Sequence, residues 1–120
     1  MSRDINIYLA GPMTGLPDFN YQEFITTAHF LRSQSGCHVV HTANLPRGWD
    51  WDKYVDLSCS VLANCDAVAV LPGSDNSKGV ELELAEAEGR DMPVFYLPDE
   101  LSDFLFWVQD KRGELYKESV

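Results

Sequence analysis

Two glutamates stand close together at the start of a predicted helix, where a carboxylate can do chemistry on a bound ligand. Glu81 and Glu83 belong to the stretch DAVAVLPGSDNSKGVELELAEAEG, which runs from Asp66 to Gly89. Side chains four residues apart stack on one helix face, so Glu83 lies over Gly79, whereas Glu81 lies over Ser77. Because glycine has no side chain, Gly79 leaves a hollow beneath Glu83, and a ligand could reach the Glu83 carboxylate through this hollow. The alternative is that both are ordinary acids near a helix start, and position alone favours that alternative.

A strand, a loop and a helix position these glutamates. The run from Asp66 to Leu71 is short, apolar and rich in valine, which is typical of a buried strand. Pro72 and Gly73 end it, because proline cannot donate a hydrogen bond to a sheet. The side chains from Asp75 to Ser77 can each cap a helix that runs from about Lys78 to Glu88. Open α/β sheets bind ligands beyond the carboxyl ends of their strands, which is where this loop lies.

A second loop suited to ligand binding follows the first predicted strand, Ile5 to Ala10. It reads GPMTGLPDFN, and its glycines and prolines predict a loop rather than a helix or a strand. Loops at this place in α/β folds often receive phosphates or sugars. It does not carry the GxGxxG dinucleotide fingerprint, and the chain has no GK[ST] of a phosphate-binding P-loop. We favour a binding loop over a plain connection.

Strands and helices alternate along the rest of the chain. The remaining predicted elements are a helix capped by Asn20 and ended by Gly36, a strand from Cys37 to His41, a helix from Asp52 to Asn64, a strand from Pro93 to Leu97, and a helix from Leu101 to Tyr116 that Gly113 could shorten. Such alternation predicts a parallel sheet with helices on both faces. We therefore expect an α/β fold: a single Rossmann-like (flavodoxin-like) three-layer domain over residues 1–120, with a parallel sheet of about four to five strands.

Two tryptophans, one serine and one helix face have more than one possible role. Trp49 and Trp51 lie in an irregular segment, where they could stack on a base. They could equally fold the segment onto the core or onto a partner subunit, which is the safer expectation. Ser58 lies inside the apolar band of its helix and should face inward, as a satisfied core hydroxyl or as a site residue. The apolar face around Phe104 and Trp107 could form part of a dimer surface.

The composition is that of a folded globular protein. The 120 residues are 45% hydrophobic and 23% charged, which is enough for one real core. A net charge of −10 argues against a nucleic-acid polymer as partner, because phosphate backbones require clustered Lys and Arg, but it allows a single nucleotide held by backbone amides. No stretch approaches ~20 apolar residues and the N-terminus lacks a signal-peptide pattern, so we expect a cytoplasmic protein without membrane contact.

The cysteines and histidines give no metal-binding pattern. They are Cys37, Cys59, Cys65, His29, His38 and His41. The cysteines are odd in number and lack CxxC spacing, so we expect reduced core thiols. Together with the histidines they form no zinc-like arrangement. We expect no metal site and no cofactor.

Several motifs together resemble a known family. They are YLAGPMTG from Tyr8, Asn20, CDAV from Cys65, LPG from Leu71, and SKGVELELA from Ser77. Over nearly the whole chain up to residue 97 the sequence resembles the small, often phage-encoded proteins of the DUF4406 family. That family in turn resembles the nucleoside 2-deoxyribosyltransferase superfamily, which includes deoxynucleoside 5′-monophosphate N-glycosidases.

The resemblance implies chemistry at the N-glycosidic bond of a 2-deoxyribose. It makes Glu83, rather than Glu81, the nucleophile that attacks the anomeric carbon, and Tyr8 the phenol that orients it. A carboxylate beside an oxocarbenium-like transition state can trap the sugar, and water or a second base then resolves the intermediate. It also matches Ser77 to a serine that holds a 5′-phosphate. The residues expected to bind substrate are Gly11, Pro12, Met13, Gly15, Asn20, Ser58, Ser77 and Gly79.

The chain departs from the family pattern at two places. The family carries an aspartate eight residues before the position of Asp66, where this chain has Ser58. Asp56 lies on nearly the opposite side of the helix and is a poor substitute. The first loop also lacks an arginine to pair with a phosphate, and Arg47 and Lys78 are the nearest candidates to replace it.

Three functions remain open from the sequence. The first is an enzyme that cleaves or transfers at the N-glycosidic bond of a deoxynucleoside or its 5′-monophosphate through Glu83. The alternative is a non-catalytic protein that sequesters a nucleotide on the same fold, and a third is an interaction protein that binds another protein through its acidic surface. We expect a nucleoside or nucleotide as ligand, a homodimer or higher homo-oligomer, and a cytoplasmic location, in the host if the protein is phage-encoded.

Overall fold

The computed structural model describes residues 4–119, and the ends of the expected domain, residues 1–3 and 120, lie outside the described residues. The strands are β1 (Asn6–Ala10), β2 (His38–Val40), β3 (Ala67–Val70) and β4 (Val94–Tyr96). The helices are the 3₁₀ helix η1 (Pro17–Asn20) and the α-helices α1 (Tyr21–Ser35), α2 (Trp51–Leu62), α3 (Lys78–Gly89) and α4 (Leu101–Ser119). Strands and α-helices therefore alternate as predicted.

The sheet is parallel and has the strand order β2-β1-β3-β4. Tyr8, near the middle of β1, pairs in register with Val40 on one side and Val68 on the other. The chain therefore extends the sheet first on one side of β1 and then on the other. The order reverses between β1 and β3, and this reversal is where open α/β sheets form a ligand-binding crevice. The predicted α/β class and the parallel sheet of about four to five strands are confirmed, and the sheet has four.

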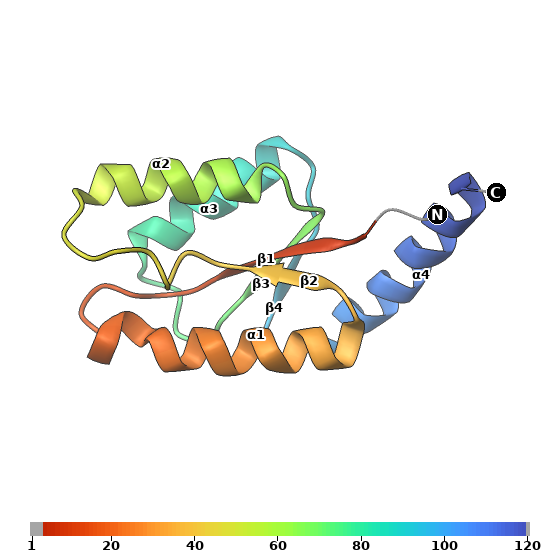
Figure 1. Cartoon of the computed structure of the whole chain (residues 1–120), viewed down its shortest axis with the longest axis horizontal. Coiled ribbons are helices and arrows are strands. Elements are labelled where there is room, and N and C mark those ends of the chain that lie inside the picture. The colour runs from red at the N-terminus through yellow and green to blue at the C-terminus, as the bar shows by residue number, and fades with distance from the viewer. Residues whose placement is uncertain (1–3, 120) are drawn as a thin grey trace.

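Helices cover both faces of the sheet. α2 and α3 lie together on one face, and α1 lies on the other with α4 packed at its end (Figure 1). Successive side chains of a strand point to opposite faces. Ile7 and Leu9 of β1 therefore join the core beneath α1 and α4, whereas Tyr8 and Ala10 point toward α2 and α3.

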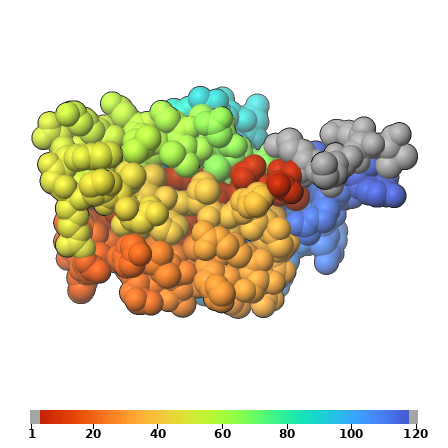
Figure 2. All heavy atoms as spheres, in the orientation of Figure 1, coloured from red at the N-terminus to blue at the C-terminus, as the bar shows by residue number. Residues whose placement is uncertain are grey.

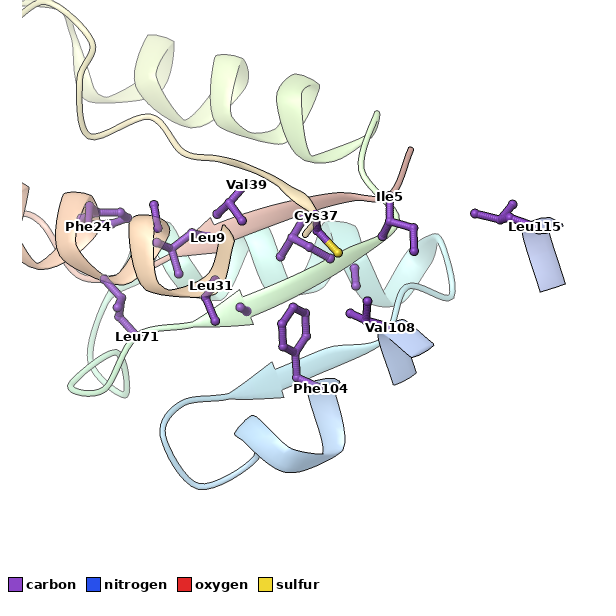
Figure 3. Packing of buried hydrophobic residues seen from close by; sticks show 14 residues of the cluster. Ile5, Leu9, Phe24, Leu31, Cys37, Val39, Leu71, Phe104, Val108 and Leu115 are labelled. Atoms are coloured by element: carbon purple, nitrogen blue, oxygen red, sulfur yellow. The ribbon is translucent and has the colours of Figure 1, made fainter. Parts of the chain in front are cut away.

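The face beneath α1 and α4 holds the larger apolar core. Phe24, Ala28 and Leu31 of α1 are buried at the spacing that the sequence predicted, with at most 2% of each exposed. Figure 3 shows Phe24 and Leu31 from α1, with Phe104 and Val108 from α4, pointing toward the strands. The helices on this face are thus held mainly by packing, and Arg112 of α4 also donates to the carbonyl of Ser35 in α1 at 2.9 Å.

The loop after β1 differs from the sequence expectation. It contains η1, whereas the sequence predicted no helix there. Asp18, Phe19 and Asn20 all have positive φ angles, of 51°, 53° and 63°. The predicted capping by Asn20 is wrong, because its side chain makes no cap and its Nδ2 instead donates to the carbonyl of Pro12 at 3.0 Å. Local sequence suggested a cap, but the left-handed backbone turns the amide back into the loop.

Two further differences concern the last helix and the cysteines. α4 continues through Gly113 to Ser119, so Gly113 does not shorten it. Beyond the glycine, Leu115 is only 6% exposed, and its burial offsets the low helix propensity of glycine. All three cysteines are free thiols, but only Cys37 is buried in the core, while Cys59 and Cys65 are half-buried.

Candidate active site

A cavity of about 800 Å³ opens at the carboxyl ends of β1 and β3. The loops after β1, β2 and β3 line it, together with residues of α2 and α3. This is the position that the reversal of strand order predicts for a ligand. Its volume is within the range of small-molecule sites, roughly 300–1,000 Å³. The loop around residues 45–50, yellow in Figure 2, forms the outer end of the molecule beside α2.

Tyr8 and Glu83 meet in this cavity. The Tyr8 phenol donates a hydrogen bond to Oε2 of Glu83. Their exposed fractions are 1% and 7%. Tyr8 points this way because it is on the α2 and α3 face of β1, and Glu83 does so because it shares the buried side of α3 with Val80 and Ala87. Glu81, two residues before Glu83, is exposed.

Burial sets the protonation of this pair. Loss of water raises the pKa of Glu83 to about 7, and the hydrogen bond from Tyr8 opposes part of that rise. Burial and the neighbouring Glu83 carboxylate raise the pKa of Tyr8 far above its ordinary value, so the phenol stays protonated and remains a donor. Near neutral pH the Glu83 carboxylate is therefore divided between its ionised and protonated forms, as suits a group that reacts at that pH.

Ser58 and Thr42 form a hydroxyl pair beside Tyr8. Their Oγ atoms lie 2.9 Å apart, and both residues are buried. Hydrogen bonding from both hydroxyls acts to lower the pKa of Tyr8, against the effect of burial. The expectation that Ser58 faces inward is confirmed, and it also lines the cavity. Thr42 was not predicted as a residue of the site, because nothing in the irregular segment that contains it indicates which residues it contacts in the folded chain.

The start of α3 provides the hollow that the spacing predicted. Ser77 is the N-cap, and its hydroxyl accepts a hydrogen bond from the Val80 N–H at 3.3 Å. A Cβ at Gly79 would meet only the Ser77 Oγ, at 3.9 Å, so the space above it is open. Ser77, Lys78 and Gly79 all line the cavity. A hydroxyl that accepts at a cap keeps its own proton to donate to a ligand.

The loop after β1 is divided between lining and supporting residues. Gly11, Pro12 and Met13 line the cavity, whereas Gly15 and Asn20 are not among the lining residues. Gly11 is also required for packing, because a Cβ there would lie 2.6 Å from Cδ1 of Leu71. The predicted binding set is therefore brought together except for Gly15 and Asn20, and Asn20 supports the loop through Pro12.

Aromatic side chains form the outer wall of the cavity. Trp49, Trp51, Tyr54 and Phe19 all line it. The rings of Trp49 and Tyr54 stack with centroids 5.4 Å apart, and the Tyr54 hydroxyl donates to the carbonyl of Pro46 at 2.6 Å and accepts from the Trp49 N–H at 3.1 Å. Both tryptophans are more than 40% exposed. The expectation that they fold onto the core is therefore wrong, whereas the alternative, a contact with a partner subunit, stays a prediction.

Arg47 joins two loops beside this aromatic wall. Its guanidinium pairs with Asp18 of η1, and its Cζ lies 4.9 Å from the centroid of the Phe19 ring. It lines the cavity as Lys78 does. The sequence offered both as phosphate partners, and the structure gives Arg47 a partner of its own.

The described residues contain neither a metal-binding cluster nor a membrane-spanning helix. No group of three or more His, Cys, Asp or Glu side chains among them is arranged to hold a metal ion. No helix in that part of the chain combines the length and the apolarity needed to cross a bilayer.

Comparisons with known proteins agree with this architecture. A solved structure of a 2-deoxyribosyltransferase from Leishmania mexicana matches with a TM-score of 0.57 and 19% identity, over 77% of this chain and 63% of that chain. The chain thus spans less than two thirds of that protein's length, and the likeness is one of fold. Curated proteins gave no match. The model of the domain of unknown function DUF4406 matches residues 5–96, which is most of the chain. The protein therefore belongs to the DUF4406 family, as its motifs had indicated.

Proposed function

We propose that the protein cleaves or transfers at the N-glycosidic bond of a 2-deoxynucleoside or its 5′-monophosphate, with Glu83 as the nucleophile. The observation that carries this proposal is the buried carboxylate of Glu83, held by the Tyr8 phenol at the wall of a ligand-sized cavity. Keeping a carboxylate from water lowers the stability of the fold, and carboxylates held in this way are concentrated at functional sites.

The geometry suits attack on a sugar. Because Tyr8 donates to Oε2, it fixes the rotation of the carboxylate and leaves Oε1 to face a ligand. The ionised Glu83 then bonds to C1′ as the bond to the base breaks, which gives a covalent intermediate. Water would release 2-deoxyribose, and a second base would give exchange. Tyr8 orients and stabilises the carboxylate throughout.

The start of α3 suits the 5′ end of the substrate. The N–H groups of a helix start and its positive dipole favour an anion. Ser77 and Lys78 stand there, and the first loop brings Gly11 to Met13 to the same cavity. A 5′-phosphate at this end would direct C1′ toward Glu83, across the hollow above Gly79.

The test is release of free base from a panel of deoxynucleosides and their 5′-monophosphates, followed by chromatography. Glu83→Ala should lower release at least about a thousandfold, because a nucleophile is lost. Glu81→Ala is the matched control, since it removes an exposed carboxylate of the same helix and should retain activity. If no member of the panel is cleaved, or if the two variants behave alike, the proposal is wrong.

A sequestering protein is the second candidate, and one observation favours it. The helix position that carries an aspartate in the resembling family holds Ser58 here, in a hydroxyl pair with Thr42. A site without a second carboxylate could bind a nucleotide and not turn it over. Thermal stabilisation by deoxynucleotides with no base release would support this candidate over the first.

A further inference from the structure

One carboxylate serves the whole cavity. Of the cavity-lining residues in the described part of the chain, Glu83 is the only Asp or Glu. Glycoside cleavage commonly uses two carboxyl groups, one to attack or stabilise the sugar and one to protonate the departing group. If Glu83 attacks C1′, no second carboxylic acid remains to give the base a proton.

The other polar groups near Glu83 do not replace that acid. The Ser58 and Thr42 hydroxyls bond to each other and to Tyr8, and a hydroxyl, including that of Ser77, is too weak an acid to protonate a departing base at neutral pH. The Tyr8 proton is directed at Glu83 itself. Arg47 is paired with Asp18, and Lys78 stands at the start of α3, the end of the cavity proposed for the 5′-phosphate. Among the cavity-lining residues that the structure describes, no side chain is therefore suited to give the base a proton.

The aromatic wall suits a positively charged ring. Trp49, Trp51 and Tyr54 line the cavity, and tryptophan is the side chain that best attracts a cation over its ring face. Arg47 already lies over Phe19 in this way. The net charge of −10 also raises the local concentration of cations around the protein.

We infer that the substrate is a 2-deoxynucleoside, or its 5′-monophosphate, whose base already carries a fixed positive charge, such as a purine alkylated at N7. This inference rests on the proposed function and names its substrate class. A charged base is a good leaving group without acid catalysis, and its ring fits against the tryptophans.

The reaction then balances without a general acid. The ionised Glu83 forms a bond to C1′ while the C1′–N9 bond breaks. The electron pair of that bond neutralises the charged ring, and the base departs neutral. Water next bonds to C1′, the bond from C1′ to the Glu83 oxygen breaks with its pair returning to the carboxylate, and one proton passes to solvent. The products are the neutral N7-alkylpurine, the 2-deoxyribose or its 5-phosphate, and H⁺.

The experiment compares 7-methyl-2′-deoxyguanosine with 2′-deoxyguanosine, each with and without a 5′-phosphate, at neutral pH. Base release is followed chromatographically, and the spontaneous rate is subtracted using reactions that contain the Glu83→Gln variant. We expect kcat/KM to be at least about 100-fold higher for the methylated compound, since general acid catalysis is worth roughly 10²–10⁴-fold and would reduce the difference where it operates. Nicotinamide 2′-deoxyriboside, whose pyridinium ring is charged but is not a purine, should also be cleaved.

Each outcome separates the two levels of the proposal. A ratio of 100 or more that depends on Glu83, together with cleavage of the pyridinium compound, supports the inference. Cleavage of both deoxyguanosines with a smaller ratio overturns the inference, because some group then protonates the base, and it leaves the proposed function standing. No Glu83-dependent cleavage of any of these compounds overturns the proposed function and the inference with it.

Discussion

The face of the sheet beneath α1 and α4 and the face beneath α2 and α3 are built from neighbouring residues of the same strands. Beneath α1 and α4, the side chains of Ile7 and Leu9 meet only apolar partners. On the other face Tyr8 lies between them in sequence and meets a carboxylate and two hydroxyls. Of the four buried polar residues found among residues 4–119, Thr42, Ser58 and Glu83 gather at this tyrosine, while Ser35 only closes the end of α1. The face beneath α1 and α4 thus contributes mainly to stability, whereas the other face gives up part of its packing for a cavity that has polar side chains in its wall.

Replacing Phe104 should have the largest effect on stability. Phe104 is fully buried beneath α4, and Phe104→Ala should lower the free energy of unfolding by about 3–5 kcal/mol, because it removes apolar contacts and leaves a cavity. Denaturant unfolding measures this change. Phe106→Ala is the matched control, since Phe106 lies on the same helix and is 73% exposed. Equal effects of the two variants would contradict the assignment of this face to stability.

Replacing Glu83, on the α2 and α3 face, with a neutral side chain should raise the free energy of unfolding by an amount that depends on pH. The pKa of Glu83 is about 7 in the folded chain and 4.5 as its ordinary value, so the folded state holds the proton more tightly. The stability this contributes is complete below pH 4.5 and is lost as pH rises through 7. Glu83→Gln, which mimics the protonated form, should therefore exceed wild type by about 3 kcal/mol at pH 8 and match it at pH 4.

Unfolding curves at several pH values test this, with Glu81→Gln as the control for loss of a charge on the same helix. A constant difference between Glu83→Gln and wild type across the range would show that the carboxylate is not desolvated.

Alanine variants of Gly11 and Gly79 test the need for close packing separately from the need for space beside Glu83. Gly11→Ala should cost about 1–3 kcal/mol of stability, because its Cβ would collide with the buried Leu71. Gly79→Ala meets no such clash and should stabilise α3 by about 0.5–1 kcal/mol, yet it narrows the hollow beside Glu83 and should weaken substrate binding. Thermal unfolding and KM measured on both variants make the comparison. The idea fails if Gly79→Ala binds substrate as wild type does.

Removing the cap of α3 should have the smallest effect. Ser77→Ala loses the hydrogen bond from the Val80 N–H and should cost about 1 kcal/mol of stability. It should also raise KM more for a 5′-monophosphate than for the nucleoside. Ser60→Ala, on the exposed side of α2 where the hydroxyl only bonds back to Asp56, is the control and should be near neutral. An equal change in KM for both substrates would argue against Ser77 as a phosphate ligand.

The regular elements and the choice of Glu83 over Glu81 could be predicted from local spacing, whereas the place of Tyr8 beside Glu83 came only from the family resemblance. Alternating strands and helices fixed the parallel sheet, and the glycine four residues before Glu83 distinguished it from Glu81. The irregular segments could not be predicted in this way. Asn20 has the residue type of a cap, but the left-handed backbone before it is set by contacts made elsewhere in the loop. Trp49 lies at the cavity in a loop that the Tyr54 hydroxyl holds through Pro46 and the Trp49 N–H, contacts that no periodicity predicts.

The ion pair between Arg47 and Asp18 should influence how fast small molecules enter and leave the cavity. It ties the segment after β2 to the segment after β1, and both side chains are more than 60% exposed. Ion pairs in contact with solvent weaken as salt screens them. The tie between these segments should therefore loosen at high ionic strength, and the rates at which small molecules enter and leave should change with salt even where the chemical step does not.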